Sequence, residues 1–99
     1  MNGVTIGDRA TRAARLQDAL QCLQPTRLVV TDDSHKHAGH EGARDGRGHF
    51  SVLVVSEAFR GKLPLARHRL VYAAVGSMME TDIHALAIKA LAPDEDQAD

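Results

Sequence analysis

The spacing of apolar and polar positions predicts a succession of short helices and strands along the 99 residues. Apolar side chains recur at three- and four-residue intervals over residues 13–23, which indicates an amphipathic helix. The runs 27–32 and 49–55 are rich in β-branched residues and indicate two strands. A second helical stripe begins at Pro64, and the apolar run 83–91 indicates a third strand.

The limits of the first helix follow from its flanking residues. Asp8 is positioned to cap its first turn, and Gln24-Pro25 ends it because proline restricts the residue before it. Cys22 lies between Leu20 and Leu23 in the sequence. We therefore expect it to be a small buried hydrophobic residue.

The residue pattern of the second half of the chain predicts a brief helical turn over residues 56–59 and then a longer helix. Pro64 suits its first position, because the N–H that proline lacks would have no partner there. The apolar face of this longer helix is expected to comprise Leu63, Leu70, Val71, Ala74, Val75 and Met78.

In the last strand, His84 is in phase with the apolar residues and is expected to be half-buried. Pro93 ends that strand.

This order predicts an α+β fold of the form αββααβ. We expect a three-stranded sheet with its first two strands antiparallel and the helices packed on one face. Residues 1–7 are interpreted as a flexible leader, residues 8–92 as the domain, and the acidic residues 93–99 as a disordered tail.

Composition narrows the classes of function. The formal net charge is −1, and a single cysteine permits no internal disulfide. No apolar run is long enough to span a membrane, so a cytoplasmic protein is expected. The isolated chain is also expected to be a monomer. We find no nucleophile and base at a recognisable spacing, no paired carboxylates and no phosphate-cradling glycine loop, so an enzyme is not predicted.

Six histidines are present, and three of them, His35, His37 and His40, fall within the polar segment 33–48. Neutral imidazole binds Zn, Cu, Fe and Ni. The spacing falls short of a zinc-finger pattern, however, and no cysteine is near. A solvated connection with incidental histidines is the simpler interpretation from the residues alone.

His68 stands between two arginines on the longer helix, and helical phase puts it at the edge of the apolar stripe. Arg67 is expected to point toward the apolar side with its stem along the core, and Arg69 to face outward. The residues alone leave two interpretations open. His68 is either a surface histidine between solubilising arginines or a ligand or anion contact.

Several linked motifs resemble the BolA family over about residues 12–92. The most diagnostic is Phe59-x-Gly61-Lys62 followed by Arg67-His68-Arg69-Leu70-Val71-Tyr72. Three further segments resemble the end of the family's first strand, its second strand and its third strand: Asp32-Asp33-Ser34, His49-Phe50-x-Val52 and His84-Ala85-Leu86-Ala87-Ile88. One departure is Gly48, where the family usually carries Ser or Thr.

The resemblance implies a class II KH-like αββααβ fold and a non-enzymatic adaptor. Such a protein pairs with a monothiol glutaredoxin and co-ligates a glutathione-bound 2Fe–2S cluster, in iron–sulfur and iron homeostasis. By the same resemblance His68 matches the family's ligand histidine. The variable segment supplies the second ligand, for which His37 aligns best and His35 and His40 are rivals.

Two alternatives remain. The first is a DNA-binding transcriptional regulator of morphology and stress response that uses residues 61–72, with Lys62, Arg67 and Arg69 on phosphates. The near-neutral charge and the scarcity of aromatic side chains weigh against it. The second is a partner that modulates glutaredoxin without any metal.

Overall fold

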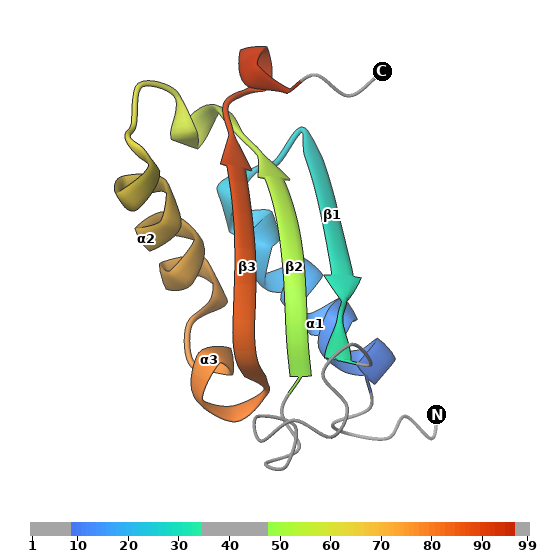
Figure 1. Cartoon of the computed structure of the whole chain (residues 1–99). Coiled ribbons are helices and arrows are strands. Elements are labelled where there is room, and N and C mark those ends of the chain that lie inside the picture. Colours follow the sequence, from blue (N-terminus) through green and yellow to red (C-terminus); the bar gives the residue numbers. More distant parts are fainter. Residues whose placement is uncertain (1–8, 35–47, 97–99) are drawn as a thin grey trace.

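The computed structural model of the chain describes residues 9–34 and 48–96 (Figure 1). The predicted order of elements is confirmed, and the fold is α+β. The elements are α1 (Arg9–Leu20), the 3₁₀ helix η1 (Gln21–Leu23), β1 (Arg27–Asp32), β2 (Gly48–Val55), the 3₁₀ helix η4 (Glu57–Phe59), α2 (Pro64–Val75), α3 (Met78–Thr81), β3 (Ile83–Leu91) and the 3₁₀ helix η5 (Pro93–Glu95).

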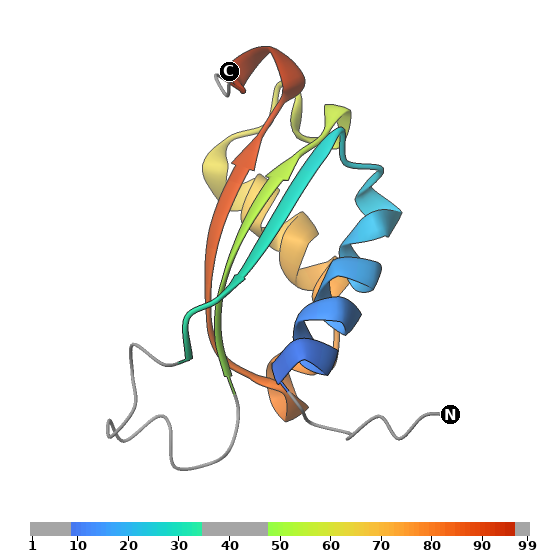
Figure 2. The same ribbon diagram turned by 90° about the vertical axis from the view of Figure 1, so that its right-hand side faces the viewer.

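The three strands form one mixed sheet in the order β1-β2-β3. β1 runs antiparallel to β2, with Arg27 opposite Val55 and Asp32 opposite Phe50. β3 runs parallel to β2 on the other side. The helices cover one face of the sheet (Figure 2), as predicted.

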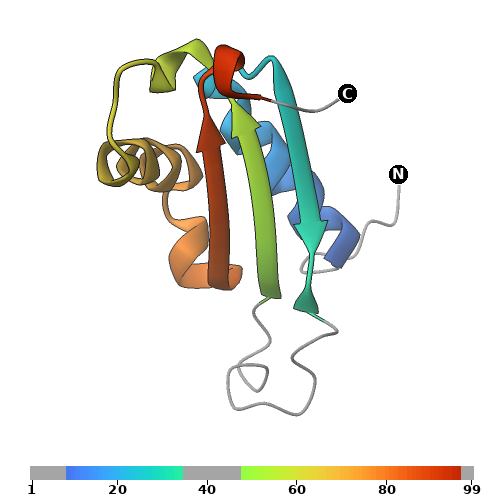
Figure 3. The same ribbon diagram turned by 45° about the horizontal axis from the view of Figure 1, so that its top comes forward.

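The sheet has two ends that carry different chemistry. At the first, β1 finishes at Asp32 while β2 and β3 begin at Gly48 and Ile83, and α3 lies beside it (Figure 3). We call it the His84 end. At the other, β1 begins and β3 finishes, and η5 follows (Figure 1). We call that the Glu95 end.

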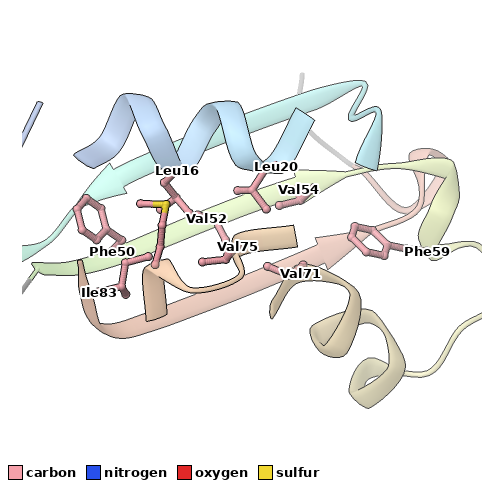
Figure 4. Packing of buried hydrophobic residues seen from close by; sticks show 10 residues of the cluster. Leu16, Leu20, Phe50, Val52, Val54, Phe59, Val71, Val75 and Ile83 are labelled. Atoms are coloured by element: carbon pink, nitrogen blue, oxygen red, sulfur yellow. The ribbon is translucent and has the colours of Figure 1, made fainter. Parts of the chain in front are cut away.

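The core lies between the sheet and the helices (Figure 4). Alternate residues of β2 face it, because successive strand side chains point to opposite faces. The stripes of α1 and α2 close over them at the helical period. The residues of this cluster are Leu16, Leu20, Phe50, Val52, Val54, Phe59, Val71, Val75, Met78 and Ile83.

The longer helix begins at Pro64 as predicted, but it ends earlier, and the residue before it is not buried. α2 stops at Val75, because Gly76 has φ 65°, a conformation that glycine adopts without strain. Met78 is buried as expected but belongs to the separate helix α3. The burial predicted for Leu63 is wrong. This residue has extended backbone ahead of the helix, and 78% of it is exposed.

The burial predicted for Cys22 is also wrong, since its side chain is exposed. Leu20 is fully buried, and a residue two positions away lies on the opposite side of a helix. On a helix, therefore, a position close in sequence to a buried residue does not predict burial.

His84 is exposed rather than half-buried because β3 contains an irregularity at its start. Gly48 pairs with Ile83, but His49 pairs with Ala85, so His84 is one residue more than β2 can match. Such an extra residue reverses the alternation of the strand. Ile83 is therefore fully buried, and the inward phase resumes at Leu86.

The C-terminal segment is folded further than expected. Pro93–Glu95 forms η5, and Glu95 accepts two hydrogen bonds from Arg67. The prediction of a disordered tail is thus wrong for residues 93–96. Residues 97–99, the proposed leader 1–7 and Asp8 lie outside the described residues.

Candidate functional site

A buried carboxylate anchors the His84 end. The Asp82 carboxylate accepts hydrogen bonds from Arg15 Nη1 at 2.6 Å and Nη2 at 3.3 Å, and from the Thr81 hydroxyl. Arg12 Nε lies 3.8 Å away, and the Asp82 carbonyl accepts the Gly48 N–H at 2.9 Å. Burial raises the pKa of Asp82, but the hydrogen bonds from Thr81 and Arg15 and the nearby positive charges outweigh it and lower the pKa. The Asp82 carboxylate thus joins α1 to the residue before β3, and the Asp82 carbonyl joins that residue to the start of β2.

Side chains also hold the place where β1 ends beside β2. The Ser34 hydroxyl accepts the His49 N–H at 3.0 Å, and the Ser34 N–H donates to Asp32 Oδ1 at 2.9 Å. The Asp33 N–H donates to the His49 carbonyl at 2.7 Å, and the Ser51 hydroxyl donates to the Asp33 carboxylate. These bonds extend the pairing of the two strands past their last ladder residues.

Gly48 is buried at this position, where the family usually has a hydroxyl residue. A Cβ there would approach Phe50 Cε2 to 2.6 Å and Ser34 Oγ to 3.0 Å. Ser34 therefore occupies space near Gly48 and supplies a hydroxyl to the backbone of His49. Glycine is required by close packing and not by an unusual backbone conformation.

Two imidazoles meet at this end. The ring centroids of His49 and His84 are 5.2 Å apart, and the rings are inclined by 40°. His84 is exposed, whereas His49 is half-buried. His49 also lines an open pocket of about 290 Å³, together with Ser51, Ala85 and Ala87. The pair stands at the edge of the helix-free face of the sheet.

The structure does not bring His68 to this end. His68 is half-buried on α2, next to Arg67, whose Nη1 donates to the Ala90 carbonyl at 3.0 Å. Residue 90 lies six positions beyond residue 84 on β3, which at roughly 3.3 Å per residue is about 20 Å. His68 is therefore associated with the Glu95 end.

The other predicted ligands, His35, His37 and His40, lie outside the described residues. Ser34, the last described residue before them, bonds to His49 at the His84 end.

Arg67 does not face an anion from outside. Its Nε donates to the Lys62 carbonyl at 2.7 Å, and its Nη atoms bond to Ala90 and to both oxygens of Glu95. Only 13% of the side chain is exposed, in agreement with its predicted inward phase. Lys62 and Arg69 are exposed. The expected anion contacts are therefore reduced to these two residues in this conformation.

Among the described residues, the His84 end offers one exposed imidazole, that of His84. Within residues 9–34 and 48–96 there is no group of three or more His, Cys, Asp or Glu arranged for a metal ion. Imidazole can replace thiolate on one iron of a 2Fe–2S cluster. The exposed ring of His84 is such a donor. The sequence contained a signal for the position of His84. His49 and His84 lie near the starts of their strands, and parallel strands begin at the same end of a sheet.

The fold and this site define a small α+β domain with imidazole donors at one end of a mixed sheet. The family model described as BolA-like protein matches residues 17–95, and the chain belongs to that family. This agrees with the resemblance carried by the sequence motifs.

Individual relatives agree with this assignment. Protein BOLA1, chloroplastic, of Arabidopsis thaliana is 40% identical over an alignment of 97 residues that covers 94% of this chain and 61% of that protein. The DNA-binding transcriptional regulator BolA of Escherichia coli is 36% identical over 75 residues, 75% of this chain and 69% of that protein. The solved BolA domain of SufE1 from Arabidopsis thaliana has a TM-score of 0.77 at 39% identity, covering 87% of this chain and 96% of that one.

No helix among the described residues is long and apolar enough to cross a membrane. The expected cytoplasmic location stays a prediction, and the first relative above is named as chloroplastic.

Proposed function

We propose that the chain is a non-enzymatic adaptor that pairs with a monothiol glutaredoxin and co-ligates a glutathione-bound 2Fe–2S cluster, in iron–sulfur and iron homeostasis. In this proposal the imidazole of the folded domain comes from His84 and not from His68. His37 remains the companion from the β1–β2 connection, with His35 and His40 as rivals.

The observation that carries the choice of His84 is its position. It is exposed at the end of the sheet where Ser34 and Gly48 flank the connection that contains the other histidines. Two ligands of one cluster must lie within a few ångströms of it. Because both described residues that flank the connection, Ser34 and Gly48, lie at this end, His84 suits this condition better than His68, whose neighbour Arg67 bonds to Ala90.

The surrounding residues would orient the donor. The His49 ring lies against His84 and restricts its rotation. Asp82 fixes the start of β3 through Arg15, and Ser34 holds the end of β1 against His49. A cluster bound there supplies one-electron chemistry, and neutral nitrogen in place of thiolate raises its reduction potential.

The test is a titration of glutaredoxin, loaded with iron, sulfide and glutathione, with the wild-type chain and matched single variants. Visible absorption and circular dichroism report the cluster's ligands. We expect the wild type to change both spectra, His84→Ala to abolish the change, and His37→Ala to weaken or alter it. His68→Ala is the matched control, since it removes an imidazole at the other end of the sheet and should keep the change.

The outcomes separate the assignments. If His68→Ala abolished the spectral change and His84→Ala kept it, the ligand would be His68 as the sequence motif implied. If the wild type left the spectra of glutaredoxin unchanged, the cluster proposal would be rejected. Binding by calorimetry in metal-free buffer would then support the metal-independent partner.

The second candidate function is DNA binding, and two observations favour it. Lys62, just before α2, and Arg69, in the middle of α2, are exposed, so phosphates can reach them. A relative that matches 75% of this chain is named as a DNA-binding transcriptional regulator. Gel-shift titrations with specific and scrambled duplexes test this function. Absence of sequence preference at physiological salt would contradict the role of a regulator.

A further inference from the structure

Three consecutive carboxylates at the Glu95 end each face an arginine from a different part of the fold. We call residues 94–96 the acidic segment. The pairs are Arg60 Nη1 with Asp94 Oδ1 at 3.3 Å, Arg67 Nη1 with Glu95 Oε1 at 2.6 Å, and Arg27 Nε with Asp96 Oδ2 at 3.9 Å. Arg27 belongs to β1, Arg60 follows η4, and Arg67 belongs to α2.

The central pair is the tightest. Arg67 Nη2 also donates to Glu95 Oε2 at 3.0 Å, so the guanidinium holds both carboxylate oxygens. The hydrogen bond from Arg67 and a second from the Ala92 N–H lower the pKa of Glu95 to about 2. A guanidinium that binds a carboxylate in this two-pronged way presents the same donors to a phosphate.

Of the remaining pairs, that of Arg60 and Asp94 is open to water, whereas the side chains of Arg27 and Asp96 are 39% and 19% exposed. The side chains of Arg60 and Asp94 are 50% and 67% exposed. Exposed ion pairs are weak and are screened by salt, so a polyanion can compete with them. Lys62 adds a fourth cation, since it is exposed and its backbone carbonyl accepts the Arg67 Nε–H at 2.7 Å. Without the acidic segment, three arginines and one lysine would share this surface with one carboxylate, that of Glu57, which accepts two hydrogen bonds from Arg60.

We propose that Arg27, Arg60, Lys62 and Arg67 form a binding surface for the phosphate backbone of nucleic acid, and that the acidic segment covers it in the free protein. The inference rests on the second candidate function and adds its regulation. The carboxylates of residues 94–96 occupy the positions of phosphates, and nucleic acid binds fully only when they leave. The cover also accounts for how a chain with a net charge of −1 can carry a phosphate-binding surface.

The test compares the wild type with Asp94→Asn/Glu95→Gln, which keeps the shape of both side chains and removes their charge. Binding to a short fluorescent DNA duplex is followed by anisotropy over a series of salt concentrations. We expect about tenfold tighter binding by the variant at about 50 mM salt. Arg67, which loses its carboxylate partner, should also steepen the slope of log K against log salt by about 0.9, while Arg60 keeps its pair with Glu57.

A matched control removes the same charge elsewhere. Asp18→Asn/Glu80→Gln neutralises two exposed carboxylates on α1 and α3. It should change the affinity by less than about twofold and leave the salt slope unchanged. Adding Arg67→Gln to the neutralised variant should reduce the slope by about 0.9, because one phosphate contact is lost.

Equal DNA affinities for the neutralised variant and the control would overturn the proposal that the acidic segment covers this surface. Salt-dependent binding by both would still support the second candidate function. No binding by any of the proteins at low salt would overturn both. Far-ultraviolet circular dichroism checks that each variant is folded. Should Asp94→Asn/Glu95→Gln unfold, Glu95→Gln alone tests the Arg67 pair, with an expected slope change of about 0.9 and the same contrary outcomes.

Discussion

The two ends of the sheet are held by charge in opposite ways. At the His84 end a single carboxylate, Asp82, is 6% exposed and binds Arg15 and Arg12. At the Glu95 end three carboxylates form three pairs, and the side chains of Asp94, Glu95 and Asp96 are 67%, 42% and 19% exposed. Ion pairs in water contribute little to stability, whereas removing one partner of a buried pair is costly. Burial, and not the number of pairs, decides which end depends on its charges.

The difference suits what we propose for each end. A ligand such as His84 needs a fixed position, and the buried Asp82 network joins the strand starts to α1. A surface that alternates between an internal carboxylate and an external phosphate needs contacts that break at little cost. Exposed pairs such as that of Arg60 meet this need.

Among the variants that test this difference between the two ends, Asp82→Ala should have the largest effect on stability. Removing the carboxylate leaves Arg12 and Arg15 without their acceptor, and we expect a loss of about 2–3 kcal/mol in the free energy of unfolding. Urea denaturation measures it. Glu95→Gln is the counterpart at the other end and should cost clearly less. Equal losses for the two variants would show that burial does not separate the ends.

Gly48→Ala probes packing at the His84 end. The added Cβ would come within 2.6 Å of Phe50 Cε2, so the ring must move, and we expect a loss of about 2 kcal/mol. Unfolding in urea measures the loss, and near-ultraviolet circular dichroism reports the displaced aromatic ring. Unchanged stability would mean that Phe50 turns aside without cost.

Gly61→Ala probes the Glu95 end by a different physical cause. No atom lies within 4 Å of the position of an added Cβ, but φ is +76°. The expected loss is about 1 kcal/mol, from backbone strain alone. Gly61→Asn should lose less than Gly61→Ala, because asparagine tolerates positive φ. At Gly48 asparagine should be worse than alanine, so the order of the two variants distinguishes strain from crowding.

The smallest effect is expected in acid. Since the pKa of Glu95 falls from 4.5 to about 2 on folding, its pair with Arg67 stabilises the protein fully above pH 4.5. That contribution is lost as the pH falls from 4.5 through 2. The difference in Tm between the wild type and Glu95→Gln should therefore be small at neutral pH and vanish near pH 2. A difference that grew in acid would contradict the assigned shift.

Local patterns predicted most of the elements. The strand 27–32 coincides with β1, and 83–91 coincides with β3, because apolar runs bounded by turn residues specify a strand without reference to its partners. Pro64 begins α2 as expected. The motifs that resemble the BolA family also led to the family to which the chain belongs.

Contacts between distant segments were beyond such patterns. The outward turn of His84 arises from its register against β2, because a strand's alternation reverses at an extra residue and only the neighbouring strand reveals one. The order of residues 93–96 depends on Arg67, which is far from Glu95 in sequence. The chain alone thus specified its elements and its family. The assembled sheet decided which histidines share an end, because proximity in space depends on pairing and packing and not on spacing along the chain.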